Sequence, residues 1–188
     1  MEEKMELSKD VILKEISKKR KFLFILSSAL ILFFLKPALL ILGIFIAIGA
    51  ISTVYKSRLN IGLDLELQSF FTIASGAIYG PAAGMIVGFL SVLIGHSLNL
   101  MFFSNPILSI IYATSFAFLG MISAGTSAGT LVIVAIIYII ANDVIFIFLG
   151  SLMGANPGRL IFSAIVHPIF VFILLSRLLI PFIKVMGE

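Results

Sequence analysis

Cysteine is absent from the 188 residues of this chain, and charged residues are scarce. Without cysteine the chain can form neither disulfide bonds nor thiolate metal sites. Charged residues make up 12% of the chain, against roughly 25% in a soluble domain. Hydrophobic residues make up 61%. A chain of this composition cannot cover its surface with polar groups, so the sequence excludes a soluble globular domain and predicts an integral membrane protein.

The few charges are concentrated at the start of the chain. Twelve of the 22 charged residues (13 basic and 9 acidic) lie within residues 1–21. This segment is too charged for the apolar core of a signal peptide, and we expect either an amphipathic helix at the membrane surface or a solvated tail. Its basic run, Lys18 to Lys21, is a topology signal rather than a nucleic-acid site. The sequence therefore divides into a charged tail, 1–21, and a single transmembrane domain, 22–188.

Long apolar segments, separated by short breaks, fill the rest of the chain. A hydrocarbon core of about 30 Å needs about 20 apolar residues per helix, so six or seven spans fit. Segment 22–35 is short, about 21 Å as a helix, and ends at Lys36-Pro37. We predict an all-α, multi-pass helical bundle of the cell membrane, with six core transmembrane helices and a short extra N-terminal hydrophobic helix at 22–35. The expected core helices cover 38–54, 67–79, 82–98, 106–123, 130–150 and 160–183.

Glycines recur at helical spacing in the middle of the chain. Gly76, Gly80, Gly84 and Gly88 lie four residues apart, and Pro81 interrupts the row where a new helix begins. Small residues at this spacing share one face of a helix and let neighbouring backbones approach closely. The predicted helix-packing residues are Gly76, Gly80, Pro81, Gly84, Gly88 and Gly95.

The string GAIYGPAAGMIVGFL, within residues 67–95, carries a family resemblance. An apolar helix that ends in Gly-Pro and is followed by Ala-Ala-Gly and Val-Gly resembles the substrate-binding S components of energy-coupling-factor (ECF) transporters. The order of segments from 38 to 184 is also similar to their six-helix fold. The resemblance implies uptake of a small vitamin-like molecule, energised by an integral membrane partner subunit and, through it, by ATPases. MreD-type membrane proteins are similar too, and that alternative implies a scaffold of the cell-shape and cell-envelope machinery.

Polar side chains are rare inside the expected spans and gather toward one end of the bundle. Alternation of the helices puts the loops 55–66, 99–105 and 151–159 on one membrane side, called side A. Asp143, the only acidic residue in a span, lies about 10 Å below side A, and His167 lies about 12 Å below it. A charged group at membrane depth is costly and marks a functional site, so we predict a substrate pocket that opens to side A. Its expected residues are Asp143, Asn142, His167, His96 and Asn99.

Each of these candidates also has a structural interpretation. Asn142 can bond a neighbouring helix, as buried amides do. His96 lies near a membrane interface, where solvation is the simpler expectation. His167 precedes Pro168 and can bond a carbonyl that the proline frees; it can also pair with Asp143 inside the bundle.

The orientation of side A depends on segment 22–35. If this segment does not span, both termini lie opposite side A, and most basic residues lie with them. If it spans, the amino terminus moves to side A together with most of the positive charge. Both arrangements satisfy the positive-inside rule. Only the first opens the pocket to the outside, as uptake requires.

Signatures of enzymes are missing from the sequence. It contains no HExxH metal motif, no nucleophile elbow and no phosphate-binding glycine loop. We therefore expect no enzyme activity, no cofactor and no metal, and a membrane-embedded enzyme is the third choice after the two family resemblances. The expected partners are a small-molecule substrate, membrane lipid and membrane protein subunits, without nucleic acid.

A strip of small residues marks the segment 38–54. Gly43, Ala47 and Ala50 lie at i, i+4 and i+7, on one helix face. In S components an alanine-rich face of the first helix docks the shared membrane subunit, and this strip resembles it with glycine in one position. The alternative is packing within the bundle, because small faces serve both uses.

Overall fold

The computed structural model describes residues 27, 36–59, 67–99, 105–154 and 156–187. Contacts divide the chain into two units, Met1–Ile41 and Leu42–Glu188. The second unit contains most of the first long helix and all later ones. The expected tail, its boundary with the transmembrane domain, and the expected short helix at 22–35 lie outside the described residues, apart from Ser27.

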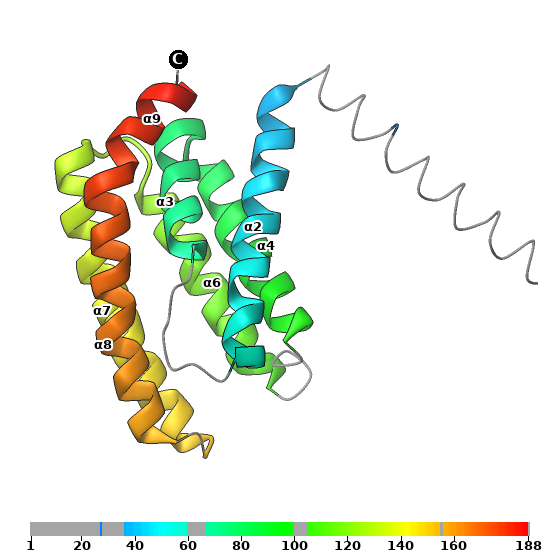
Figure 1. The fold of residues 1–188 in the computed structure, drawn as a ribbon, viewed down its shortest axis with the longest axis vertical. Coiled ribbons are helices and arrows are strands. Elements are labelled where there is room, and N and C mark those ends of the chain that lie inside the picture. The colour runs from blue at the N-terminus through cyan, green and yellow to red at the C-terminus, as the bar shows by residue number, and fades with distance from the viewer. Residues whose placement is uncertain (1–26, 28–35, 60–66, 100–104, 155, 188) are drawn as a thin grey trace, which may run out of the picture. The chain divides into compact units, whose positions relative to one another are not determined.

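The described chain consists of helices and turns, and the described ranges contain no strand, in agreement with the predicted all-α fold. The helices are α2 (Pro37–Leu59), α3 (Gln68–Tyr79), α4 (Pro81–Leu98), α6 (Pro106–Ile122), α7 (Ala128–Leu152), α8 (Pro157–Leu174) and α9 (Ile180–Gly187). A π-helical turn, η1 (Leu175–Leu179), joins α8 to α9. Figure 1 shows α7 and α8 side by side as an antiparallel pair, while α3 packs against α4, α6 and the C-terminal helices.

The lengths of the described helices indicate a membrane protein in which α3 is a short internal helix. Four described helical segments are long and apolar enough to cross a membrane: Pro37–Val54, Pro81–Leu98, Ala128–Leu152 and Leu160–Met186. The apolar helix α6 has 17 residues. Helix α3 has only 12 residues, or about 18 Å, which is well short of the roughly 30 Å of hydrocarbon.

A glycine–proline pair sets the turn between α3 and α4. Gly80 has a φ of 90°, in the region that side chains rarely adopt and glycine adopts freely. Pro81 follows as the first residue of α4, where its fixed φ suits a helix start. A Cβ added to Gly80 would meet nothing within 4 Å. Gly80 therefore serves the turn and not the helix contact that its spacing predicts.

Close backbone contact joins α3, α4 and α6. Gly76 on α3, Gly84 on α4 and Gly120 on α6 meet at one place: a Cβ on Gly84 would overlap the Gly120 carbonyl and lie 2.8 Å from Gly76 Cα. One turn further along α4, a Cβ on Gly88 would lie 2.9 Å from Thr72 Cγ2. Only glycine permits such an approach, which gains dispersion contacts along both backbones. Gly120 was not among the predicted packing residues.

The helix α3 is enclosed by its neighbours. Nine consecutive residues, from Gln68 to Gly76, are buried. Phe71 stacks on Phe45 of α2 with ring centroids 4.9 Å apart, and Phe70 meets Phe182 of α9 edge-on at 5.4 Å. These aromatic contacts fill the interior beside α3 and hold the C-terminal helix against it.

The glycine contact leads to a stability prediction. Gly84→Ala should lower the free energy of unfolding in detergent by about 1–3 kcal/mol, because its methyl group overpacks backbone that cannot move aside. Gly129→Ala is the matched control, since a Cβ there meets nothing within 4 Å; it should leave stability unchanged or raise it slightly. Thermal unfolding checks both, and equal melting temperatures for Gly84→Ala and the wild type would contradict the three-glycine contact.

Candidate functional site

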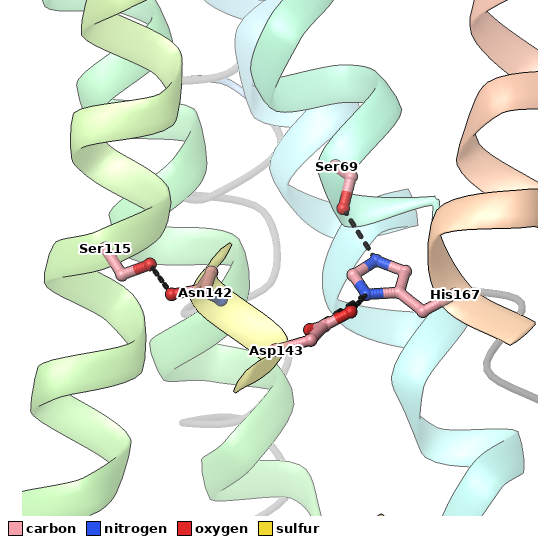
Figure 2. A network of polar contacts seen from close by, with 5 residues as sticks. All are labelled: Ser69, Ser115, Asn142, Asp143 and His167. Carbon is pink, nitrogen blue, oxygen red and sulfur yellow. Dashed lines mark hydrogen bonds and ion pairs between the residues drawn. The ribbon is translucent and has the colours of Figure 1, made fainter. Parts of the chain in front are cut away.

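Three polar side chains from three helices meet inside the bundle (Figure 2). The ring of His167 on α8 lies between the other two: Nε2 is 3.1 Å from Ser69 Oγ on α3, and Nδ1 is 3.1 Å from Asp143 Oδ2 on α7. Their exposed fractions are 0% for Ser69, 1% for His167 and 9% for Asp143. This group, the Ser69–His167–Asp143 cluster, contains the Asp143–His167 pair that the sequence predicts, and that pair is confirmed.

The hairpin of α7 and α8 brings Asp143 and His167 to the same depth. Asp143 lies nine residues before Leu152, where α7 ends, and His167 lies ten residues after Pro157, where α8 begins. Each is therefore about 15 Å from the connection between the two helices. Ser69 reaches the same place because α3 starts inside the bundle: Gln68 Nε2 donates to the Ser91 carbonyl in the middle of α4 at 2.9 Å.

Hydrogen bonding and charge favour a defined arrangement of this cluster. An ionised carboxylate only accepts hydrogen bonds, so the Nδ1–H of His167 donates to Asp143, whose oxygens lie at 3.1 and 3.3 Å. Nε2 then accepts from the Ser69 hydroxyl in the neutral ring, or donates to it in the charged ring. A carboxylate this far from water is costly unless it is paired and hydrogen-bonded, and His167 provides both.

Asn142 points away from Asp143, toward α6. The Ser115 hydroxyl donates to Asn142 Oδ1, and Figure 2 shows the two neighbours in sequence facing different helices. Tyr138 adds a hydrogen bond from its hydroxyl to the Ser115 carbonyl at 2.7 Å. Successive residues lie about 100° apart around a helix, so adjacent polar residues need not share a site. Asn142 therefore joins α7 to α6, as the alternative prediction of a bond to a neighbouring helix has it.

His96 and Asn99 bond elsewhere. His96 is buried, its Nδ1 lies 3.0 Å from Ser109 Oγ, and its ring stacks on Tyr112 at 5.4 Å. The expectation that His96 is solvated near the interface is wrong, because α6 covers it. Asn99 Nδ2 donates to the Thr53 carbonyl at 3.1 Å and thereby joins α4 to α2. The predicted residues thus bond to several different partners, and the cluster retains only Asp143 and His167 of them.

The polar residues of α3 were not among the residues predicted for the site. Gln68, Ser69, Thr72 and Ser75 are all fully buried, within a segment read only as an apolar span. Among the described residues, Gln68 Oε1, Thr72 Oγ1 and Ser75 Oγ have no hydrogen-bond partner. The available signal was their spacing, since residues 68, 72 and 75 recur at i, i+4 and i+7 on one face.

The strip of small residues on α2 is divided between two environments. Gly43 and Ala47 are exposed, and a Cβ on Gly43 would meet nothing within 4 Å. Ala50 is 1% exposed, and a Cβ on Gly95 of α4 would lie 3.2 Å from its carbonyl oxygen. The same Cβ would lie 2.6 Å from Thr53 Oγ1. Ala50 and Gly95 therefore belong to the contact between α2 and α4, and only Gly43 and Ala47 remain on the outer face.

Comparison of the chain with protein-family models, with curated proteins and with solved structures finds no match. Within the described residues, no three side chains of His, Cys, Asp or Glu gather as metal ligands would. The Ser69–His167–Asp143 cluster and its position in the bundle are therefore the features that point to a function.

A double-mutant cycle tests the Asp143–His167 pair. His167→Ala should cost about 3–5 kcal/mol of unfolding free energy, because it leaves a carboxylate buried without its partner. Asp143→Ala should cost less, since a neutral imidazole tolerates burial better than a lone charge. The double variant should be at least as stable as His167→Ala, as measured by unfolding in detergent. Strictly additive losses would show that the two side chains are not coupled.

Proposed function

We propose that the chain is the substrate-binding membrane subunit of an uptake system for a small vitamin-like molecule, and that the Ser69–His167–Asp143 cluster lies at its binding site. The observation that carries the proposal is a carboxylate hydrogen-bonded to an imidazole inside a bundle of membrane-spanning helices. Ionisable groups at this depth are expensive, and membrane proteins keep them chiefly on substrate and ion pathways.

The position of the cluster suits a pocket open to one membrane side. In the proposed arrangement six core helices form a multi-pass bundle in the cell membrane, segment 22–35 adds a short N-terminal helix, and side A faces outside. Because α3 begins inside the bundle, Ser69 joins Asp143 and His167 at about 15 Å from the α7–α8 connection. The cluster offers a small polar molecule both hydrogen-bond donors and acceptors, which a binding site needs for orientation and specificity.

A buried charged cluster favours substrate binding over the MreD-like alternative. A scaffold recognises other proteins through its outer surface, and a carboxylate in the interior adds nothing to such contacts while it costs stability. Under the scaffold interpretation, polar residues of this kind would be expected at the membrane faces. Substrate binding gives the interior cluster a function that offsets the stability it costs.

Energy for uptake comes, in this proposal, from an integral membrane partner and the ATPases attached to it. The exposed part of α2 supports such docking. Gly43 and Ala47 are exposed beside the apolar side chains of Ile44, Ile48 and Ile51. Small residues among larger apolar ones let another helix approach closely in the membrane.

Substrate binding is tested first. Mass spectrometry of the purified protein under native conditions should detect a co-purifying small molecule, and Asp143→Ala should remove it while the protein stays folded. His167→Ala should weaken binding less, because the carboxylate remains. Ser97→Ala is the control, since its hydroxyl bonds the Leu93 carbonyl of its own helix and lies outside the cluster. Normal binding by Asp143→Ala, or co-purification of cell-wall machinery in place of a small molecule, would contradict the proposal.

Partner docking is tested on neighbouring positions of one helix. Ala47→Leu should leave folding and substrate binding intact but abolish partner association and uptake, because the bulkier side chain projects from the outer face. Ala50→Leu is the matched comparison, and it should cost about 1–3 kcal/mol of stability by overpacking the contact with α4. Thermal unfolding beside a pull-down of the partner subunit separates the two effects. An Ala47→Leu variant that still associates would rule out docking at this face.

A further inference from the structure

The Ser69–His167–Asp143 cluster has the order of groups that activates a serine hydroxyl. His167 Nε2 faces Ser69 Oγ at 3.1 Å, and the opposite ring nitrogen faces the Asp143 carboxylate at 3.1 Å. In serine-dependent acyl transfer a carboxylate holds one ring nitrogen so that the other can take the hydroxyl proton, and this arrangement recurs on unrelated folds. We propose that Ser69 is a nucleophile that accepts the acyl group of a lipophilic ester, an activity that goes beyond the proposed uptake function.

Each group has a definite task in this reaction. Ser69 Oγ attacks the ester carbonyl carbon, its proton passes to His167 Nε2, and an Oγ–C bond forms. The tetrahedral intermediate then breaks its bond to the alcohol oxygen, which takes the proton back from Nε2 as it leaves. Water attacks the acyl-serine by the same route, releases a carboxylic acid and restores the hydroxyl. The Asp143 carboxylate accepts the hydrogen bond from Nδ1–H throughout and stabilises the imidazolium that forms.

The first turn of α3 supplies stabilisation for the intermediate. Ser69 is the second residue of α3, which begins at Gln68. The N–H groups of a first turn have no carbonyl acceptor within the helix, and they form the positive end of its dipole. In the proposed reaction, first-turn N–H groups of α3 stabilise the oxyanion that develops beside Ser69.

The outer faces of the two helices that carry Asp143 and His167 are apolar. Val144 and Ile145 follow Asp143 on α7 and are exposed, as are Ile165 and Ile169 on either side of His167 in α8. Exposed apolar residues on membrane-spanning helices face hydrocarbon. A molecule that reaches α7 and α8 from the hydrocarbon must dissolve in lipid, so we take the acyl donor to be an ester with an acyl chain.

Covalent labelling tests the nucleophile. The purified protein in detergent is incubated with an alkyl fluorophosphonate, and intact-mass spectrometry should show one phosphonyl adduct that peptide mapping assigns to Ser69. Ser69→Ala should remove the adduct, and His167→Gln should slow labelling by about 100-fold or more, the scale of general-base assistance. Ser75→Ala removes another buried hydroxyl of α3 and should label at the wild-type rate. Asp143→Asn, which keeps the ring but disturbs its tautomer, should also label slowly and serves if His167→Gln does not fold.

Access to the buried hydroxyl is measured independently. Because the chain has no cysteine, Ser69→Cys introduces a single thiol, and a small membrane-permeant thiosulfonate should modify it. The proposal is overturned if that thiol stays unmodified, or if it reacts while the wild-type protein gains no phosphonyl adduct. Equal labelling rates in the wild type and in folded His167→Gln or Asp143→Asn would overturn it as well, because the reactivity would then owe nothing to the cluster.

Discussion

The meeting of three glycine backbones decides where α3 lies, and the interior of the protein depends on that position. Gly76, Gly84 and Gly120 let three helices approach without intervening side chains. Such an approach replaces contacts that lipid would otherwise make and gains dispersion along the whole interface. A helix of 12 residues has too little surface to be held in a bundle by loosely packed side chains alone. The glycines give it close packing over its whole length.

The polar interior follows from the same constraint. Since α3 is short and is anchored near Gly80, its first residues lie within the bundle and not at the membrane surface. Ser69 therefore meets His167, although 98 residues separate them in sequence. The cluster is a property of the assembled bundle, because α3, α7 and α8 each supply one member.

The sequence predicted those features that depend on composition and on one helix at a time. Apolar length predicted the four described helices that are long enough to cross a membrane, and the carboxylate of Asp143 at a depth similar to that of His167 predicted their pairing. Features that depend on how helices rotate against one another were missed. Asn142 and Asp143 are adjacent yet face different helices, and His96 is covered by α6 although its place in the chain suggested solvent. Ser69 and Gly120 gave no distinctive local signal, because a serine or a glycine in an apolar span becomes informative only once its neighbours are known.

The helix that carries His167 has its hydrogen-bond ladder interrupted twice. Pro168 cannot donate to the carbonyl four residues before it, and the π-helical turn at Leu175–Leu179 changes the register of the backbone bonds a little further on. Interruptions of this kind are where helices bend. A bend at Pro168 or at the π-helical turn leaves the regular helix on either side intact. His167 immediately precedes the first interruption, so a bend of α8 at Pro168 would change the distances from its ring to Ser69 and to Asp143.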